Sequence, residues 1–234
     1  MPTTRRERMR DATLLEIKEV AREHLRAHGP SGISLRGIAR DIGMTAPALY
    51  RYYAGLDDLL AAMIQTYANE MCDAMEAARD ALPGDDLGGR LLAVTRAFRR
   101  WALDHPPEFT MVFGAPVPGF SKLKAADEAG SRLGGIFLRL FAELWHRQPF
   151  PVPTDEEITP ALRHQLRLFG AECGADEAGV PLGVLRLYVS SWVRLYGLVA
   201  MEIFGHVHFM LEDPDPLFES ELADVARTIG LKDT

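Results

Sequence analysis

Residues 34–60 read SLRGIARDIGMTAPALYRYYAGLDDLL. Ser34 is a favoured helix N-cap, and apolar residues recur after it at helical spacing until Gly43. Thr45 can cap a second short helix, and Pro47 then falls in its first turn, where a missing N–H costs nothing. Two short helices joined by a tight turn form a helix-turn-helix, whose second helix lies in the major groove of DNA. The stretch therefore predicts a DNA-binding fold.

The second short helix begins with small side chains. Thr45, Ala46 and Pro47 allow the helix to approach base edges closely. The Thr45 hydroxyl can donate or accept a hydrogen bond, and the methyl group of Thr45 or Ala48 can contact a thymine methyl. We therefore expect this end of the helix to read bases.

The same helix ends in aromatic and cationic side chains. The phenol groups of Tyr50 and Tyr52 suit phosphate oxygens, and Arg51 can reach a phosphate or a guanine. Tyr53 follows Leu49 by four residues, so we expect it in the core. The alternative interpretation of residues 34–53 is a corner between two helices in which the aromatic residues only form a core.

Charge is distributed unevenly along the chain. Residues 1–53 hold ten basic and six acidic side chains, a net charge of +4, whereas the remaining 16 basic and 27 acidic side chains give −11. A basic head on an acidic body indicates that only the head meets nucleic acid. Four arginines near the start form either an arm along DNA or a solvated, disordered segment: Arg5, Arg6, Arg8 and Arg10.

Helical periodicity continues through the rest of the chain, and no alternating strand pattern of useful length occurs. We predict an all-α fold with a helix-turn-helix domain over residues 1–54 and a helical effector-binding and dimerisation domain over residues 55–234. The predicted helices beyond the two short ones span 11–28, 56–81, 87–104, 107–113, 122–147, 159–172, 181–207 and 216–230.

Several other classes of protein are disfavoured. The apolar run 184–207 contains Arg186, Arg194 and Glu202, which are expensive at the centre of a bilayer, so we expect a buried helix and no membrane contact. The N-terminus has no secretory signal, and two cysteines without metal spacing suit a reducing compartment, which we take to be the cytoplasm.

Enzymatic chemistry has no clear signature in the sequence. No GxSxG, Walker loop or Gly-rich nucleotide-binding turn occurs. His206 and His208 point about 200° apart on one helix, so a single ion cannot take both unless the helix ends between them. We predict no catalytic residue, no metal site and no cofactor.

Residues 11–60 resemble the N-terminal DNA-binding domain of the TetR (tetracycline-repressor) family of bacterial transcriptional regulators. The resemblance rests on AHG at the end of the first helix, GISLRGIARDIG, MTAPALYRYY and GLDDLL, in family order. One departure is Leu56, where the family usually has a phosphate-binding lysine. The resemblance implies a set of DNA-contacting residues at groove and phosphate positions: Ser34, Arg36, Thr45, Ala46, Pro47, Tyr50, Arg51 and Tyr52.

The segment SSWVRLYGLVAMEIFG is similar to the Trp-x3-His-Gly pattern of one C-terminal subgroup of this family, with Tyr196 in place of the histidine. The family pattern implies a homodimer formed through about 181–207 and 216–230. It also implies a double-stranded, pseudo-palindromic DNA operator from which a small-molecule effector releases the protein, more often a repressor than an activator. The alternatives are a helical interaction or ligand-binding protein that has lost specific DNA binding, and an enzyme.

Because the family senses small molecules, the aromatic residues of the body become candidates for a ligand chamber. An aromatic stripe at helical spacing is more often core, but the group suits an apolar cavity with a few polar groups. Arg99, Arg100, His105 or Arg139 could bind one ligand carboxylate. The predicted effector, small and hydrophobic or amphipathic, would contact Phe98, Trp101, Phe137, Phe141, Trp145, Tyr188 and Trp192.

Overall fold

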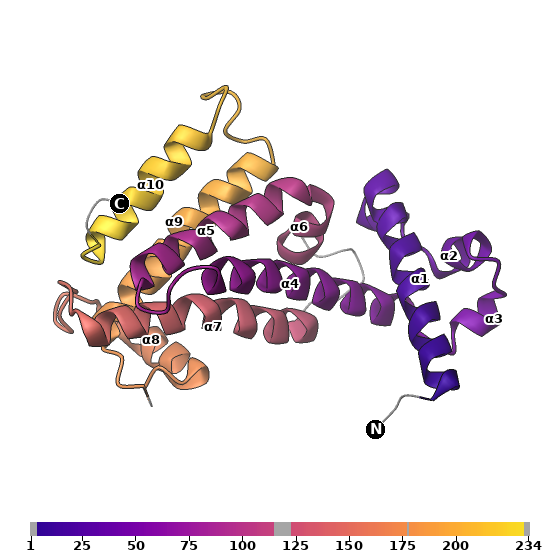
Figure 1. The fold of residues 1–234 in the computed structure, drawn as a ribbon, viewed down its shortest axis with the longest axis horizontal. Coiled ribbons are helices and arrows are strands. Elements are labelled where there is room, and N and C mark those ends of the chain that lie inside the picture. The colour runs from indigo at the N-terminus through magenta and orange to yellow at the C-terminus, as the bar shows by residue number, and fades with distance from the viewer. Residues whose placement is uncertain (1–3, 115–122, 177, 232–234) are drawn as a thin grey trace. The chain divides into compact units, whose positions relative to one another are not determined.

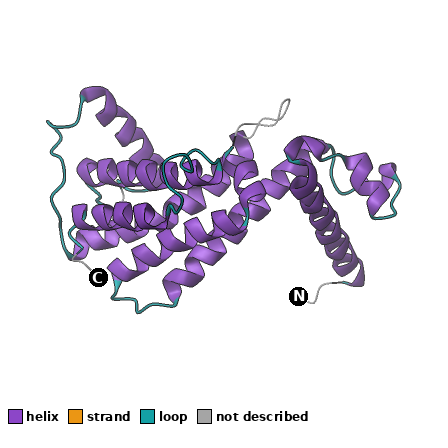
Figure 2. Cartoon of the chain, turned by 90° about the horizontal axis from the view of Figure 1, so that it is seen from above, coloured by secondary structure: helices purple, strands orange, loops and turns teal. Residues whose placement is uncertain are grey.

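The computed structural model describes residues 4–114, 123–176 and 178–231. Over these residues the chain forms ten α-helices and one short 3-10 helix, with no strand, which confirms the predicted all-α class (Figures 1 and 2). The elements are α1 (Arg5–His28), η1 (Pro30–Gly32), α2 (Leu35–Asp41), α3 (Ala46–Leu49), α4 (Leu56–Asp80), α5 (Leu87–Asp104), α6 (Pro106–Phe113), α7 (Leu123–Arg147), α8 (Pro160–Cys173), α9 (Leu182–Ile203) and α10 (Asp215–Thr228).

The chain divides into two compact units. Unit 1 comprises Met1–Glu70 and His105–Ala129, and unit 2 comprises Met71–Asp104 and Gly130–Thr234. Helix α4 begins in unit 1 and ends in unit 2, and α6 belongs to unit 1 although α5 belongs to unit 2. The predicted boundary between residues 54 and 55 stays a prediction.

Helix α1 begins six residues before its predicted start at Asp11. The Thr4 hydroxyl accepts a hydrogen bond from the Glu7 N–H (3.2 Å), and the Glu7 carboxylate accepts one from the Thr4 N–H (2.6 Å). This capping box satisfies two backbone donors that would otherwise lack a partner, so the arginine-rich segment continues the helix. The sequence left two alternatives for these arginines, an arm along DNA or a solvated, disordered segment. The chain is helical from Arg5 onward, so a disordered segment does not describe them.

The helix-turn-helix forms as the sequence predicts. The Ser34 hydroxyl caps α2 by accepting a hydrogen bond from the Gly37 N–H (3.1 Å). Gly43 has φ 67°, a left-handed conformation that favours glycine and turns the chain toward α3. Leu49 and Tyr53 are buried, with exposed fractions of 0% and 5%, so they anchor α3 to the core of unit 1 as predicted.

A polar face of α1 joins it to α4 and α6 within unit 1. The Lys18 ammonium donates to the Thr66 hydroxyl (2.8 Å), and the Arg22 guanidinium donates to the Glu70 carboxylate (2.5 Å). The Arg26 guanidinium donates to the carboxylate of Glu108 (2.9 Å), which lies on α6 and is fully buried. The position of α6 is thereby tied to α1, the helix that supports the helix-turn-helix.

In unit 2, helices α5, α9 and α10 lie side by side, and α8 packs against α9 (Figure 1). Helix α9 ends at Ile203 rather than at the predicted residue 207, because Gly205 adopts φ 75° and the chain turns there. Within the described parts of the chain, none of the helices combines the length and apolar character that a membrane crossing requires.

Candidate DNA interface and effector cavity

The predicted DNA-contacting side chains gather around α3 in unit 1. Thr45, Pro47, Tyr50 and Arg51 are exposed, whereas Ala46 is half-buried. The Thr45 hydroxyl makes no capping hydrogen bond to α3, so it is not committed to the backbone of its own helix. Thr45, Tyr50 and Arg51 present a hydroxyl, a phenol and a guanidinium to solvent, which are groups that hydrogen-bond to base edges and phosphates. The Pro47 ring can make only an apolar contact.

The other three predicted DNA contacts, Ser34, Arg36 and Tyr52, lie at the start of α2 or after α3, and they differ in exposure and in their partners. Arg36 is exposed on the first turn of α2, and the Ser34 hydroxyl still has its proton to donate while it accepts the capping bond. Tyr52 is half-buried, and the guanidinium carbon of Arg10 lies 5.7 Å from the centre of its ring. Tyr52 is therefore a neighbour of α1, a contact that the sequence pattern did not predict.

Leu56 is the first residue of α4 and is half-buried. The Asp58 carboxylate accepts a hydrogen bond from the Ala54 N–H (3.1 Å), which fixes the chain where α4 begins. This helix start therefore has backbone N–H groups that can meet a phosphate, but its first side chain is apolar.

We expect Leu56→Lys to tighten DNA binding by up to about tenfold at low salt, because the new ammonium neutralises one more phosphate in each half-site. The slope of log affinity against log salt should steepen by about 1.8 for a dimer, at about 0.9 for each phosphate neutralised. Leu56→Gln, which has similar length and no charge, is the matched control. An unchanged salt slope for Leu56→Lys would show that residue 56 does not approach the backbone.

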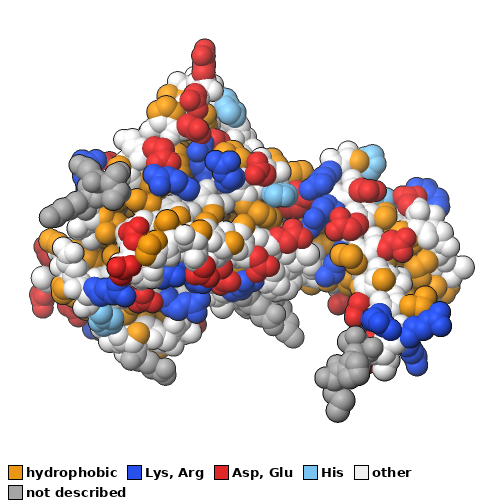
Figure 3. Space-filling view, in the orientation of Figure 1, with side chains coloured by type: hydrophobic (Ala, Val, Ile, Leu, Met, Phe, Trp, Pro, Cys, Tyr) orange, Lys and Arg blue, Asp and Glu red, His pale blue; other side chains and the backbone are white. Residues whose placement is uncertain are grey.

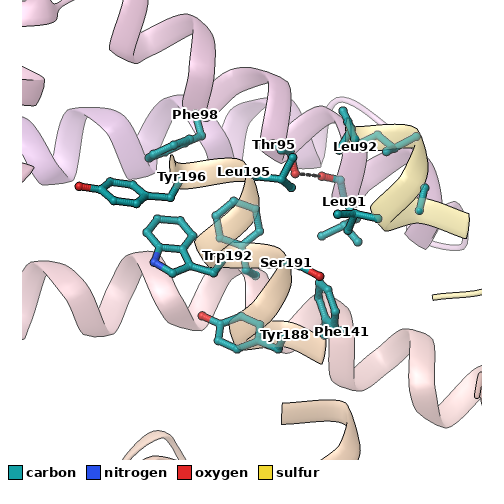
Figure 4. Close-up of a pocket in the computed structure, with 14 residues that line it drawn as sticks. Leu91, Leu92, Thr95, Phe98, Phe141, Tyr188, Ser191, Trp192, Leu195 and Tyr196 are labelled. Atoms are coloured by element: carbon teal, nitrogen blue, oxygen red, sulfur yellow. Dashed lines mark hydrogen bonds between the residues drawn. The ribbon is translucent and has the colours of Figure 1, made fainter. Parts of the chain in front are cut away.

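A cavity opens among α5, α7, α9 and α10 in unit 2 (Figure 4). The free volume of this cavity is about 30 Å³, so the side chains nearly fill it. In Figure 4 the Trp192 ring stands between those of Tyr196 and Tyr188. The lining residues are Leu91, Leu92, Thr95, Phe98, Phe137, Phe141, Tyr188, Ser191, Trp192, Leu195, Tyr196, Leu222, Val225 and Ala226.

Aromatic rings form the centre of this cavity. The ring of Trp192 lies 5.5 Å from that of Phe98 and 5.8 Å from that of Phe137, and it stacks on Tyr196 at 5.3 Å. The Phe141 ring meets Tyr188 edge-on at 5.6 Å. These centroid distances are in the range of favourable aromatic pairs.

Five of the seven predicted ligand residues line the cavity: Phe98, Phe137, Phe141, Tyr188 and Trp192. The other two lie elsewhere in unit 2. Trp101 is buried in α5, and the Trp145 ring meets Phe150 edge-on at 5.3 Å. Tyr196 lines the cavity although it is absent from the residues expected from the sequence. Its spacing of four residues from Trp192 on one helix was the signal that could have found it.

Two polar groups of the lining are committed to the protein backbone. The Thr95 hydroxyl donates to the Leu91 carbonyl (2.9 Å), and the Tyr188 hydroxyl donates to the Gly134 carbonyl (3.2 Å). Burial raises the pKa of Tyr188 to about 12, so its hydroxyl stays protonated at neutral pH. The cavity therefore offers mainly apolar and aromatic surface.

Arg99, a candidate partner for a ligand carboxylate, already has two carboxylate partners. Its guanidinium donates to both oxygens of Glu202 (2.8 and 2.7 Å) and also to Asp215. Arg99 and Glu202 are each 8% exposed, and the Arg99 guanidinium carbon lies 4.6 Å from the centre of the Phe218 ring. This group joins α5 to α9 and α10 and is not available to a ligand.

Metal chemistry finds no support among the residues that the structure describes. No group of three or more His, Cys, Asp or Glu side chains in those parts of the chain could hold an ion. His206 and His208 follow the end of α9 and are exposed.

Two family models match this chain, one near the N-terminus and one over most of the rest. Residues 17–63 match the family described as bacterial regulatory proteins, tetR family, and residues 91–225 match the tetracyclin repressor-like C-terminal domain. The HTH-type transcriptional regulator Rv1816 of Mycobacterium tuberculosis is 29% identical over 211 residues, which cover 88% of this chain and 87% of that protein.

Solved structures give the same result. The crystal structure of the regulatory protein SCO4313 is 31% identical, covers 95% of this chain and 98% of its own, and has a TM-score of 0.76. A tetR-family regulatory protein from Rhodococcus RHA1, at 17% identity and a TM-score of 0.62, covers 94% of this chain and 98% of its own and shares the fold. These relatives are named as regulators rather than enzymes. The chain is a DNA-binding transcriptional regulator and belongs to the tetR family of bacterial regulatory proteins.

Proposed function

We propose that this regulator is a homodimeric repressor that a small apolar or amphipathic molecule releases from a pseudo-palindromic operator. The observation that carries the proposal is the aromatic cavity of unit 2 in a chain whose unit 1 presents a helix-turn-helix. Phe98, Phe137, Phe141, Tyr188 and Trp192 form the proposed effector contacts. The protein acts in the cytoplasm, with no catalytic step of its own.

A second copy of the chain is the proposed partner at α9 and α10. Three apolar side chains of α9 and its end are exposed: Val193 by 63%, Met201 by 39% and Phe204 by 40%. They recur at helical spacing, so they form one face that a partner would cover. Dimers with two-fold symmetry read half-sites about 34–36 Å apart, one turn of DNA, or a multiple of that distance.

The cavity is too small for an effector as it stands. Pockets for small ligands commonly enclose about 300–1,000 Å³, whereas this one leaves only about 30 Å³ for the centre of a water-sized sphere. An effector must therefore part the rings around Trp192. By preferring that opened conformer it shifts the population of the protein, and a coupling of about 1–3 kcal/mol is enough for a useful switch.

The chain offers a direct route from the cavity to the head. Helix α5 contributes Phe98 to the lining and continues through His105 into α6. Helix α6 carries Glu108, which accepts a hydrogen bond from Arg26 of α1. We propose that a displacement of α5 is passed along the chain to α6, which is bonded to α1, the support of the helix-turn-helix.

A thermal-shift screen of apolar metabolites and antibiotics, followed by operator-release assays, tests the proposal. Phe137→Ala should weaken binding of a genuine effector by about tenfold or more, equivalent to about 1.4 kcal/mol. Trp101→Ala is the matched control, because Trp101 is as well buried (6% against 8% exposed) but does not line the cavity. A compound that stabilises the protein and leaves operator binding unchanged would argue against release by this cavity.

A further inference from the structure

A groove of about 930 Å³ lies in unit 1 between the first turns of α1 and the chain that follows α3. Its lining includes four arginines, Arg5, Arg6, Arg10 and Arg51, together with Tyr52. All four arginines are exposed, and none has an ion-pair partner among the described residues. Figure 3 shows Lys and Arg side chains, in blue, gathered at the end of unit 1 where α1 begins.

Two features of the groove favour an anion as its occupant. Glu7 is the acidic residue in the lining. Its carboxylate already accepts a hydrogen bond from the Thr4 N–H in the capping box of α1, and it forms no ion pair with the four arginines. The guanidinium carbon of Arg10 lies 5.7 Å from the centre of the Tyr52 ring, a cation–π distance that restrains the long side chain. The positive charge is therefore both uncompensated and partly pre-organised.

We propose that this groove binds a phosphate of the operator backbone, beside the major groove that α3 enters. Arg6 and Arg10 contact the phosphate, and Tyr52 acts as the support that positions Arg10. This inference rests on the proposed operator binding. Arg51 and Tyr52 follow α3 along the chain, so a phosphate in the groove would lie near the helix that enters the major groove. The inference assigns Tyr52 a positioning role, in place of the direct phosphate contact expected from the sequence.

A phosphate contact in this groove would also compensate for the missing positive charge at position 56, where the residue is Leu. Phosphate contacts fix the register of a protein on DNA and supply most of its salt-dependent affinity. Leu56 offers no charge at the start of α4, and the arginines of α1 supply positive charge at the groove instead. Because the capping box keeps these arginines helical, they present fixed positions rather than a loose arm.

The test is the salt dependence of operator binding, measured by fluorescence anisotropy on an operator obtained by selection from random duplexes. Arg10→Gln should reduce the slope of log affinity against log salt by about 1.8 for the dimer, at about 0.9 for each phosphate that is no longer neutralised. Arg8→Gln is the matched control, because Arg8 is exposed on the same turn and carries the same charge but does not line the groove. Equal slopes for the two variants would overturn the proposal.

Two variants of Tyr52 separate positioning from direct contact. Tyr52→Phe keeps the ring and should keep the slope, whereas Tyr52→Ala releases Arg10 and should reduce the slope as much as Arg10→Gln does. A reduced slope for Tyr52→Phe would mean that the hydroxyl itself touches the phosphate and would contradict the assignment.

Phosphate ethylation supplies the second readout. One ethylated phosphate per half-site should weaken binding of the wild-type protein and no longer affect Arg10→Gln; interference that persists in the variant would count against the groove. If the wild-type protein selects no operator at all, the proposed function fails. If it selects one that Arg10→Gln binds with unchanged slope, only this inference fails.

Discussion

Arg99→Ala is expected to lower the free energy of unfolding by about 3–5 kcal/mol, the usual cost of removing one partner from a buried ion pair. The change leaves the Glu202 carboxylate, 8% exposed, without the two hydrogen bonds that Arg99 donates to it. Asp215 also loses its bond but is exposed and can be hydrated. Most of the cost therefore comes from Glu202.

The neighbouring Arg96 provides the control. Arg96 lies one turn earlier in α5 and binds both oxygens of Glu219, yet the two side chains are 52% and 47% exposed. Arg96→Ala should cost less than about 1 kcal/mol, because solvent screens an exposed pair. Urea unfolding at a fixed protein concentration measures both, and tryptophan fluorescence reports on unit 2 because all three tryptophans lie there. Equal losses for the two variants would show that burial does not control the strength of this pair.

The double variant Arg99→Met with Glu202→Leu distinguishes the cost of an unpaired buried charge from a need for the ion pair itself. Two apolar side chains of similar volume often replace a buried ion pair at little cost or with a gain. The double variant should therefore recover most of the stability that Arg99→Ala loses. A double variant as unstable as Arg99→Ala would mean that α5, α9 and α10 need the charged group for more than local pairing.

Helices flanked by Gly- and Pro-rich breaks could be predicted from the sequence. The span of α5 agrees with its predicted range of 87–104, because LPGDDLGG breaks the chain before it and HPPE after it. The start of α1 was missed although its signal was present. Thr4 and Glu7 have the spacing of a capping box, and the arginines between them suit a helix once that cap forms.

Contacts between distant segments could not be predicted in the same way. Glu108 looks like an ordinary charged residue near the start of a short helix, and its partner Arg26 precedes it by 82 positions. The choice between core and cavity has the same difficulty. Trp101 and Phe98 lie on one helix three residues apart, and only the placement of α9 decides that Phe98 faces the cavity.

The structure also changes what kind of effector the sequence suggests. Arg99 was a candidate for a ligand carboxylate, and its pairing with Glu202 and Asp215 removes that possibility. Because Thr95 and Tyr188 donate their hydroxyl protons to backbone carbonyls, the remaining lining is dominated by rings and aliphatic side chains. A neutral aromatic molecule is therefore a better match than a charged one.

Trp192→Ala should lower the free energy of unfolding by about 2 kcal/mol, less than for a fully buried ring, because truncating this large, half-buried side chain removes its packing and leaves a void. The ring now touches Phe98, Phe137 and Tyr196 in a cavity with almost no free space. The void has the shape of an indole ring and apolar walls, and such voids bind apolar molecules. Indole added to the variant should therefore fill it.

Indole at about ten times its Kd should restore about 1.4 kcal/mol to Trp192→Ala, from the linkage between binding and folding. The wild-type protein, whose cavity is already filled by Trp192, should gain nothing. Indole-3-acetate carries the same ring with a carboxylate and should rescue poorly, because Arg99 is already paired and the walls are apolar. Thermal unfolding of both proteins with both compounds measures this. Better rescue by indole-3-acetate than by indole would show that a cation reaches the cavity, and equal gains for wild type and variant would show that indole binds elsewhere.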